Sequence, residues 1–331
     1  MRLLLVAWGA SILLLSPVAH GAEPSSVDKA RIARTIATGS RAEVERSISQ
    51  IKQMGAPRDL LRQVALLLQE GDPRARKNAA YVFSTGAYPS VKAQLIEALS
   101  DEDEVVREHC ATALGRVRAP EAVSALGRLT SDRSPVVRRE AAKALGHIGS
   151  KAAVPKIVPM LQDSSPDARI AAILALGALR DKSAEKNLLP LLQDPSETTR
   201  LAAAKSLCAL DNAEGRKQVE ALLGSPEPAE RRDGIKLVED VKHPWIRDAM
   251  LGLTGDNDLN VAIAAARGLA LQGDARGVEW LVRSSQRVAP QSVLKIETVL
   301  EDLQLSSADR KAILARKPSP GLVLPPLEQE R

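Results

Sequence analysis

The sequence predicts an all-α fold, a right-handed α-solenoid of about nine helix-pair repeats of 31 residues each. Three observations predict it: arginines that recur every 31 residues, a helix-start signal before each arginine, and an apolar stripe at helical spacing after each one. The arginines are Arg76, Arg107, Arg138, Arg169, Arg200 and Arg231.

A helix-start signal precedes every one of these arginines. Most residues four positions earlier are good N-caps, which satisfy free amides at a helix start: Asp72, Asp103, Ser134, Ser165, Ser196 and Glu227. In four repeats the next residue is a proline, which is favoured at the first helical position: Pro73, Pro135, Pro166 and Pro228. We therefore expect one helix to begin three residues before each arginine.

The apolar stripe is clearest when the arginine is counted as position zero. Positions three and seven are apolar, and position three is small in most repeats, so that neighbouring helices can approach closely. Position eight is Gly115, Gly146 or Gly177 in three repeats, which we expect to weaken the helix near its end. The remainder of each repeat has its own apolar stripe and predicts a second short helix. One pair cannot bury its apolar face alone, whereas a stack of pairs makes a continuous core.

The frame sets the domain organisation. We expect the solenoid to cover residues 39–315, with a divergent unit at 39–69 and with Ala262 and Val293 in place of the arginine in the last two repeats. Residues 23–38 form a lead-in, and residues 316–331 contain four prolines and predict an extended, mobile tail.

Residues 1–22 have the layout of a secretory signal peptide. Arg2 precedes an apolar run of 13 residues, and small residues at 19–22 offer a cleavage site near Gly21 or Ala22. The run is shorter than the roughly 20 residues of a membrane-spanning helix. We expect an exported protein, periplasmic or secreted, with no membrane span after cleavage. An uncleaved N-terminal anchor is the alternative.

The repeated unit resembles a known family. The stretch SDRSPVVRREAAKALG, residues 131–146, is similar to the HEAT repeat, and particularly to its short form in phycobilisome-lyase-type proteins. The resemblance implies a ladder of hydrogen bonds between adjacent units, in which the acid and the arginine of each unit take part. The implied pairs are Asp101/Arg107, Asp132/Arg138 and Asp163/Arg169, with Asp194 and Arg200 extending the column. Ser225 and Ala262 depart from the pattern and interrupt it.

Few residues suggest chemistry. The chain has 46 basic and 41 acidic residues, two cysteines and 2% aromatic residues. His109 and His147 lie at different helical positions of successive repeats, about 10 Å apart along the axis, so they cannot share a metal. Cys110 and Cys208 lie three repeats apart, too far for a disulfide, and we expect free thiols. No catalytic residue, metal site or cofactor is predicted.

The candidate site is the helix face opposite the apolar stripe, at positions one and five. By the family resemblance this face lines a concave groove. Its centre is apolar and its rim basic, which suits an acidic, partly apolar segment of another envelope protein. The groove residues are Arg139, Lys143, Ile170, Leu174, Leu201, Lys205, Arg232 and Lys236.

The sequence therefore predicts a non-catalytic protein-binding scaffold of the cell envelope. One alternative is a module that binds a polyanion, either nucleic acid or an acidic polysaccharide, although export makes nucleic acid an unlikely partner. A less favoured alternative is a lyase-type accessory enzyme. Trp245 and Trp280 lie on the second helices of adjacent repeats and have two interpretations, ordinary packing or a second partner-binding spot.

Overall fold

The computed structural model describes residues 25–325, and the leader 1–22 and the last residues of the tail lie outside this range. Within it the chain forms helices and turns and no strand, which confirms the all-α prediction. The described residues divide into two compact units, 25–206 and 207–325. None of their helices is both long and apolar enough to cross a membrane.

The first helix of each repeat begins where the sequence predicts, three residues before its arginine. Caps of the expected kind start several of them; for example, the Asp72 carboxylate accepts a hydrogen bond from the Ala75 amide at 2.8 Å. These first helices are α4 (Pro73–Ser84), α6 (Glu104–Arg116), α8 (Pro135–Ile148), α10 (Pro166–Ala178), α12 (Glu197–Ala209), α14 (Pro228–Val238), α16 (Leu259–Leu271) and α18 (Pro290–Asp302).

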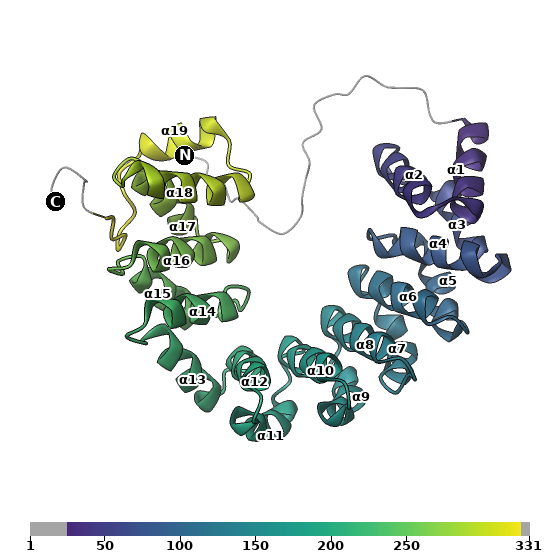
Figure 1. The fold of residues 1–331 in the computed structure, drawn as a ribbon, viewed down its shortest axis with the longest axis horizontal. Coiled ribbons are helices and arrows are strands. Elements are labelled where there is room, and N and C mark those ends of the chain that lie inside the picture. Colours follow the sequence, from purple (N-terminus) through teal and green to yellow (C-terminus); the bar gives the residue numbers. More distant parts are fainter. Residues whose placement is uncertain (1–24, 326–331) are drawn as a thin grey trace, which may run out of the picture. The chain divides into compact units, whose positions relative to one another are not determined.

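The second helix of each repeat is shorter, and in the first unit it is partly 3₁₀. Prolines within these segments, such as Pro159 and Pro190, remove a backbone donor where an α-helix would need it. The second helices are α5 (Lys92–Glu97), α7 (Val123–Leu129), α9 (Val154–Ile157), α11 (Glu185–Leu188), α13 (Ala213–Leu223), α15 (Pro244–Leu253), α17 (Ala275–Ser284) and α19 (Ser307–Leu314). In the unit 25–206, the first helices form a row on the inner side of its bend and the second helices form the outer row (Figure 1).

The N-terminal end holds one helix more than predicted. The expected lead-in at 23–38 contains α1 (Ser26–Thr38), which buries Ile32 and Ile36 and packs against α3 (Arg58–Glu70) and α4. Between them, α2 (Arg41–Gln53) packs against α1 and α4. The solenoid therefore begins at α1, because the apolar face of α4 needs a cover on its N-terminal side.

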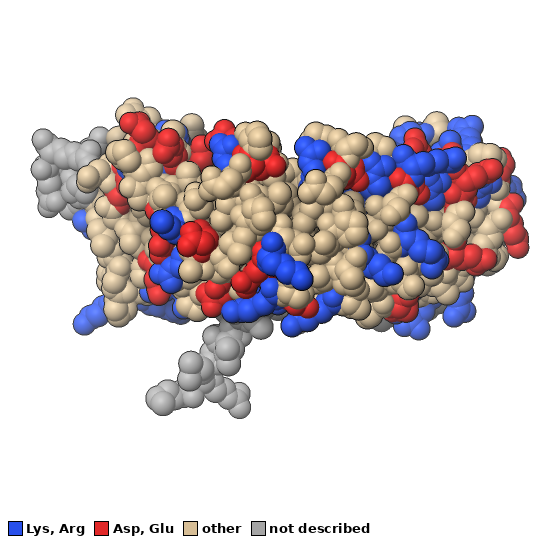
Figure 2. All heavy atoms as spheres, turned by 90° about the horizontal axis from the view of Figure 1, so that it is seen from below, with Lys and Arg blue, Asp and Glu red and all other residues tan. Residues whose placement is uncertain are grey.

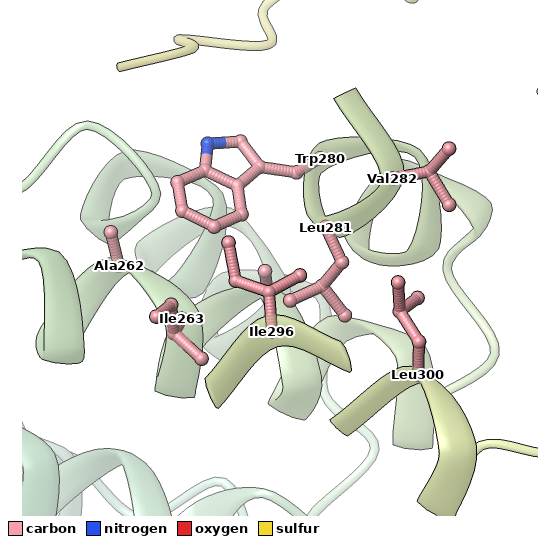
Figure 3. Packing of buried hydrophobic residues seen from close by; sticks show 8 residues of the cluster. Ala262, Ile263, Trp280, Leu281, Val282, Ile296 and Leu300 are labelled. Carbon is pink, nitrogen blue, oxygen red and sulfur yellow. The ribbon is translucent and has the colours of Figure 1, made fainter. Parts of the chain in front are cut away.

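The unit 207–325 ends in a core built around Trp280 of α17. Trp280 is fully buried with Ile263, Ile296 and Leu300, and Figure 3 shows its ring beside Ile296 with the indole nitrogen pointing away from that residue. Ala262, which occupies the arginine position, also belongs to this cluster. The last repeat interface is therefore apolar where earlier interfaces carry a charge.

The tail differs from the predicted mobile segment. Residues 316–325 contain a turn at 320–321, where Gly321 has a φ of 79°, and they lie against α17: the Trp280 indole Nε1 donates to the Val323 carbonyl at 2.6 Å, and Leu322 and Leu324 pack on the Trp280 core. Repeat periodicity cannot predict this contact, because the segment has no helical period and its partners lie about 40 residues away.

Candidate protein-binding surface

An arginine ladder holds the first helices of the inner row in register. The Arg107 guanidinium binds the Asp132 carboxylate through two hydrogen bonds of 2.8 Å, and Arg138 binds Asp163 at 2.6 and 2.7 Å. Arg76 and Asp101 form a further pair in this unit. In the other unit Arg231 binds Asp256 in the same way, at 2.8 Å. Such two-pronged pairs fix geometry as well as charge.

The ladder partners differ from the implied pairs by one repeat. Arg107 meets Asp101 of its own repeat through the backbone carbonyl at 2.8 Å, while its carboxylate partner belongs to the next repeat. Arg138 does the same with the Asp132 carbonyl and the Asp163 carboxylate. The reason is geometric: each acid also accepts the amide two residues on, as Asp132 does from Ser134, and this turn points the carboxylate back toward the preceding repeat.

The remaining ladder residues show part of the same pattern. Arg169 donates to the Asp163 carbonyl at 2.7 Å and Arg200 to the Asp194 carbonyl at 2.8 Å. Ser225, which replaces the acid, keeps the turn by accepting the Glu227 amide but supplies no charge. The ladder has a structural role, because the hydrogen bonds of its arginines go to carbonyls and carboxylates inside the stack.

The ion pairs of the ladder lower the pKa values of its aspartates. The hydrogen bond from Arg138 is the main cause that holds the pKa of Asp163 below its ordinary value, against the opposing effect of burial. Burial alone would raise the pKa of Asp132, but Arg107 and the Ser134 amide together lower it. Both acids are therefore charged in the folded protein near neutral pH.

Glycines at position eight let successive inner helices touch. A Cβ atom on Gly146 would lie 3.1 Å from the Ala175 Cα, and one on Gly177 would lie 2.7 Å from the Ser206 Cα. The helices end within two residues of these glycines, as expected, but the closer constraint is the backbone of the next repeat. The glycines thus set the spacing of the inner row.

The inner face of the unit 25–206 brings together six of the eight predicted groove residues. They lie at positions one and five of α8, α10 and α12: Arg139, Lys143, Ile170, Leu174, Leu201 and Lys205. Leu174 is 37% exposed, and Ile170 and Leu201 are partly exposed. Arg232 and Lys236 are exposed on α14, which belongs to the other unit.

The basic rim is partly neutralised by an acid that sequence reasoning missed. Glu140 accepts hydrogen bonds from both Arg139 and Lys143 at 2.9 Å. Burial would raise the pKa of Glu140, but these two cations hold it below its ordinary value. The rim on α8 therefore carries one net positive charge rather than two.

The apolar centre is wider than positions one and five. Ala178 and Ala209 take position nine of α10 and α12, and Ala178 is exposed. Helical spacing places positions five and nine on one face, so this signal was present in the sequence. Ile170, Leu174, Ala178 and Leu201 form what we call the apolar centre of the inner face.

The N-terminal end of the inner row is covered by α2. The Arg41 guanidinium lies 3.2 Å from the centre of the Tyr81 ring, and the Tyr81 ring lies 5.6 Å from that of His109. Burial, and next Arg41, lower the pKa of His109. His109 is thus a packed, neutral side chain at this edge.

Other candidate chemistry is sparse in the part of the chain that the structure describes. No cluster of three or more histidine, cysteine or acidic side chains able to hold a metal occurs there. Cys110 and Cys208 are free and buried, which confirms the unpaired thiols, and burial raises the pKa of both, that of Cys208 to about 12. On the face drawn in Figure 2, basic and acidic side chains are interspersed.

Comparisons with known proteins agree with this architecture. HEAT repeats match residues 59–132, 92–167, 128–208 and 154–235, which together span more than half of the chain. The complex of CpcE and CpcF of phycocyanin lyase from Nostoc sp. PCC7120 is similar in structure, with a TM-score of 0.50 and 20% identity over 73% of this chain and 94% of that one. No curated protein matches the chain.

Two more solved structures are similar at lower scores. A designed armadillo repeat protein in complex with the peptide (KR)4 is 18% identical over 56% of this chain and 92% of its own, with a TM-score of 0.42. Human deoxyhypusine hydroxylase is 17% identical over 77% of this chain and 99% of its own, with a TM-score of 0.34. These likenesses concern the fold alone. From the repeat matches and the helix-pair stack, the chain belongs to the HEAT-repeat family, a helical-repeat scaffold whose fold suits protein binding.

Proposed function

We propose that this chain is a non-catalytic scaffold of the cell envelope that holds an acidic, partly apolar segment of another protein on its inner face. The carrying observation is Leu174, a leucine 37% exposed at a position where the neighbouring repeats have Lys143 and Lys205. An exposed leucine leaves apolar area in contact with water, whereas in a partner-binding centre that area is buried by the partner.

The flanking charges support an acidic partner. Arg139 and Lys143 outnumber Glu140 on α8, and Lys205 lies on α12 at the other side of the apolar centre. Charges at the rim steer association more than they add affinity, while buried apolar area supplies the affinity. A segment with a few apolar residues between acids satisfies both parts of this surface.

A non-catalytic role is favoured by the state of the reactive side chains. His109 is packed against Tyr81, and burial suppresses ionisation of both thiols, so neither cysteine is an activated nucleophile. A lyase-type activity would need reactive groups that this surface does not present among the described residues.

The envelope assignment rests on the leader sequence. N-terminal sequencing of the protein recovered from its native host should begin near Ala22 or Glu23. A soluble cytosolic chain that retains Met1 would contradict export, and a membrane-bound one would favour the uncleaved anchor.

The inner face is tested by site-specific crosslinking. A photoreactive phenylalanine analogue at position 174 should give a defined adduct in the host envelope. The same group at Leu66, an outward leucine of α3 that is 48% exposed, serves as the matched control and should not. Equal labelling at both positions, or an adduct at Leu66 alone, would contradict the proposal.

Charge substitution then separates the alternatives. With the captured partner, Ile170→Asp combined with Leu174→Asp should abolish binding while circular dichroism stays helical. A polyanion would instead bind through the rim, and its affinity would fall steeply with salt and barely change with the two aspartates. That second outcome would replace the protein-binding interpretation.

A further inference from the structure

The unit 207–325 contains an occupied peptide site. We call the surface of α15 and α17 that holds residues 316–325 the tail site. The Val323 side chain lies against Gly255 after α15, and Gly321 lies near Leu251. On α17, the Trp280 Nε1 donates to the Val323 carbonyl. Just after α17, Arg287 donates to the Pro325 carbonyl at 2.7 Å.

Most of the polar contacts at the tail site are to backbone atoms. Arg283 donates to the Arg316 carbonyl at 2.5 Å, and also to the Ile313 carbonyl of α19 at 3.1 Å. Glu279 accepts from the amide and hydroxyl of Ser319. Contacts with a main chain do not depend on side-chain identity, so a tryptophan, two arginines and a glutamate in or just after α17 hold this proline-containing segment.

The preceding pair of second helices presents similar groups around an open pocket. This Trp245 pocket, of about 560 Å³, is lined by Arg216, Glu220 and Leu223 of α13 and by Trp245, Asp248 and Gly252 of α15. The Arg216 guanidinium lies 4.9 Å from the Trp245 ring centre and is paired with Glu220 at 2.7 Å. All six residues belong to the same compact unit as the tail site.

Two features distinguish this pocket from ordinary packing. Trp245 is only partly buried, and among residues 25–325 no acceptor is bonded to its indole Nε1, whereas that of Trp280 is bonded to the tail. A Cβ atom on Gly252, an exposed lining residue, would meet nothing within 4 Å, so a ligand backbone has room beside it. A tryptophan N–H beside an open pocket is a donor that suits a carbonyl ligand.

We propose that the Trp245 pocket binds an extended, proline-containing segment of a partner protein through its main-chain carbonyls, as the tail site binds the carbonyls of Val323 and Pro325. The polyproline conformation keeps carbonyls exposed and costs little entropy to fix, which suits an aromatic-lined groove. Two acids, Glu220 and Asp248, against one Arg216 disfavour an acidic segment and favour a basic residue beside the prolines. This ligand differs from the acidic segment proposed for the inner face.

The test uses the full chain labelled with 5-fluorotryptophan and observed by ¹⁹F NMR. Substituting Trp8, Trp245 and Trp280 singly by phenylalanine assigns the three signals. The probe is the acetylated, amidated peptide KPSPGLVLP, which has the sequence of residues 317–325. We expect a saturable shift of the Trp245 signal below about 1 mM peptide, with the Trp280 signal unchanged because its site is already filled.

Gly252→Leu is the blocking variant, because its side chain enters the pocket and leucine suits a helix better than glycine. It should weaken binding at least tenfold, while Gly252→Ala, the matched control, keeps most of the affinity. A probe with glycine at each proline should also bind at least tenfold more weakly. A Trp245 signal that does not move, or a shift of Trp280 alone, would overturn the proposal. Leu174→Asp should leave this binding intact, so failure here and failure at the inner face are distinguishable.

Discussion

The repeat interfaces α6–α8 and α8–α10 differ from the last one, α16–α18, in what holds them together. In the first unit, small side chains and a charged ladder join consecutive inner helices: Gly115 against Ala144, Gly146 against Ala175, and Arg107 or Arg138 on the next acid. At the last interface the ladder position is Ala262, and the acid position is Arg287.

The last interface has an aromatic core and the segment 316–325 in place of the glycine contacts and the charged ladder. Trp280 fills the space around Ala262, and Arg287 holds the Pro325 carbonyl. The physical reason is that an inner repeat has a neighbour on each side, whereas a terminal repeat must cover its apolar face with something else. Close contact between helix backbones therefore joins the repeats of α6, α8 and α10, whereas large side chains around Trp280 join α16 to α18.

The largest expected loss of stability is at the Trp280 core. Trp280→Ala should destabilise the unit 207–325 by about 3–5 kcal/mol, because it removes a fully buried side chain and the donor that holds the tail. Amide hydrogen exchange should show faster opening of α16–α18, with α6–α10 unchanged. Trp245→Ala, at a partly exposed site, is the control and should cost much less. Equal losses would contradict the distinction between these tryptophans.

The tight interfaces should be sensitive to added volume. Gly177→Val places atoms against the Ser206 Cα and threatens the 2.8 Å hydrogen bond from Ser206 Oγ to the Ile173 carbonyl, so we expect a loss of about 1–3 kcal/mol or more. Gly252→Ala adds a Cβ into open space and should be neutral or stabilising by less than about 1 kcal/mol. Urea unfolding measures both. A tolerated valine at 177 would mean that the inner helices can separate at little cost.

Loss of one ladder arginine should destabilise the protein no more than the added volume at Gly177. Arg138→Ala leaves the Asp163 carboxylate without its partner and should cost about 1–3 kcal/mol. Asp163→Asn and the double variant complete a cycle that isolates the pair. Lys156→Ala, on the outer helix α9, is the control for loss of a single charge. A coupling energy near zero would make the ladder irrelevant to stability.

Low pH should reduce the free energy of unfolding of the unit 25–206 by protonating Asp163 of the Arg138–Asp163 pair. The pKa of Asp163 is lowered on folding, so its contribution is fully present above the unfolded aspartate pKa of about 3.9 and is lost as pH falls through the lower folded value. The urea midpoint should therefore fall between pH 5 and pH 3, by less in Asp163→Asn than in the unaltered chain. An identical pH dependence in both would remove Asp163 from the explanation.

The smallest expected effect is on the reactivity of the two thiols, which is measured without altering the packing of either unit. Cys110 and Cys208 are buried and have raised pKa values, so both should react slowly with a thiol reagent in the folded protein and reach two thiols per chain on denaturation. Single Cys→Ala variants assign the rates. A thiol that reacts at the rate of the denatured chain would show that its repeat is already open.

The periodic part of the fold was predictable because each repeat meets nearly the same neighbours. A 31-residue arginine spacing with caps at fixed offsets predicted every first-helix start from α4 to α14. The face of Ile170, Leu174 and Leu201 followed from helical geometry in the same way. Partial neutralisation by Glu140 did not, because charge alone does not say which cation an acid will meet.

By itself, the sequence determined the fold class, the repeat length, the helix starts and the absence of a disulfide between Cys110 and Cys208, since all of these depend on local propensity and period. Tertiary structure decided which repeat supplies the carboxylate to each arginine, why Gly146 and Gly177 cannot be larger, and where residues 316–325 dock. These three depend on contacts between residues 25 to 70 positions apart in the chain, and such contacts are set by packing geometry that no single repeat encodes.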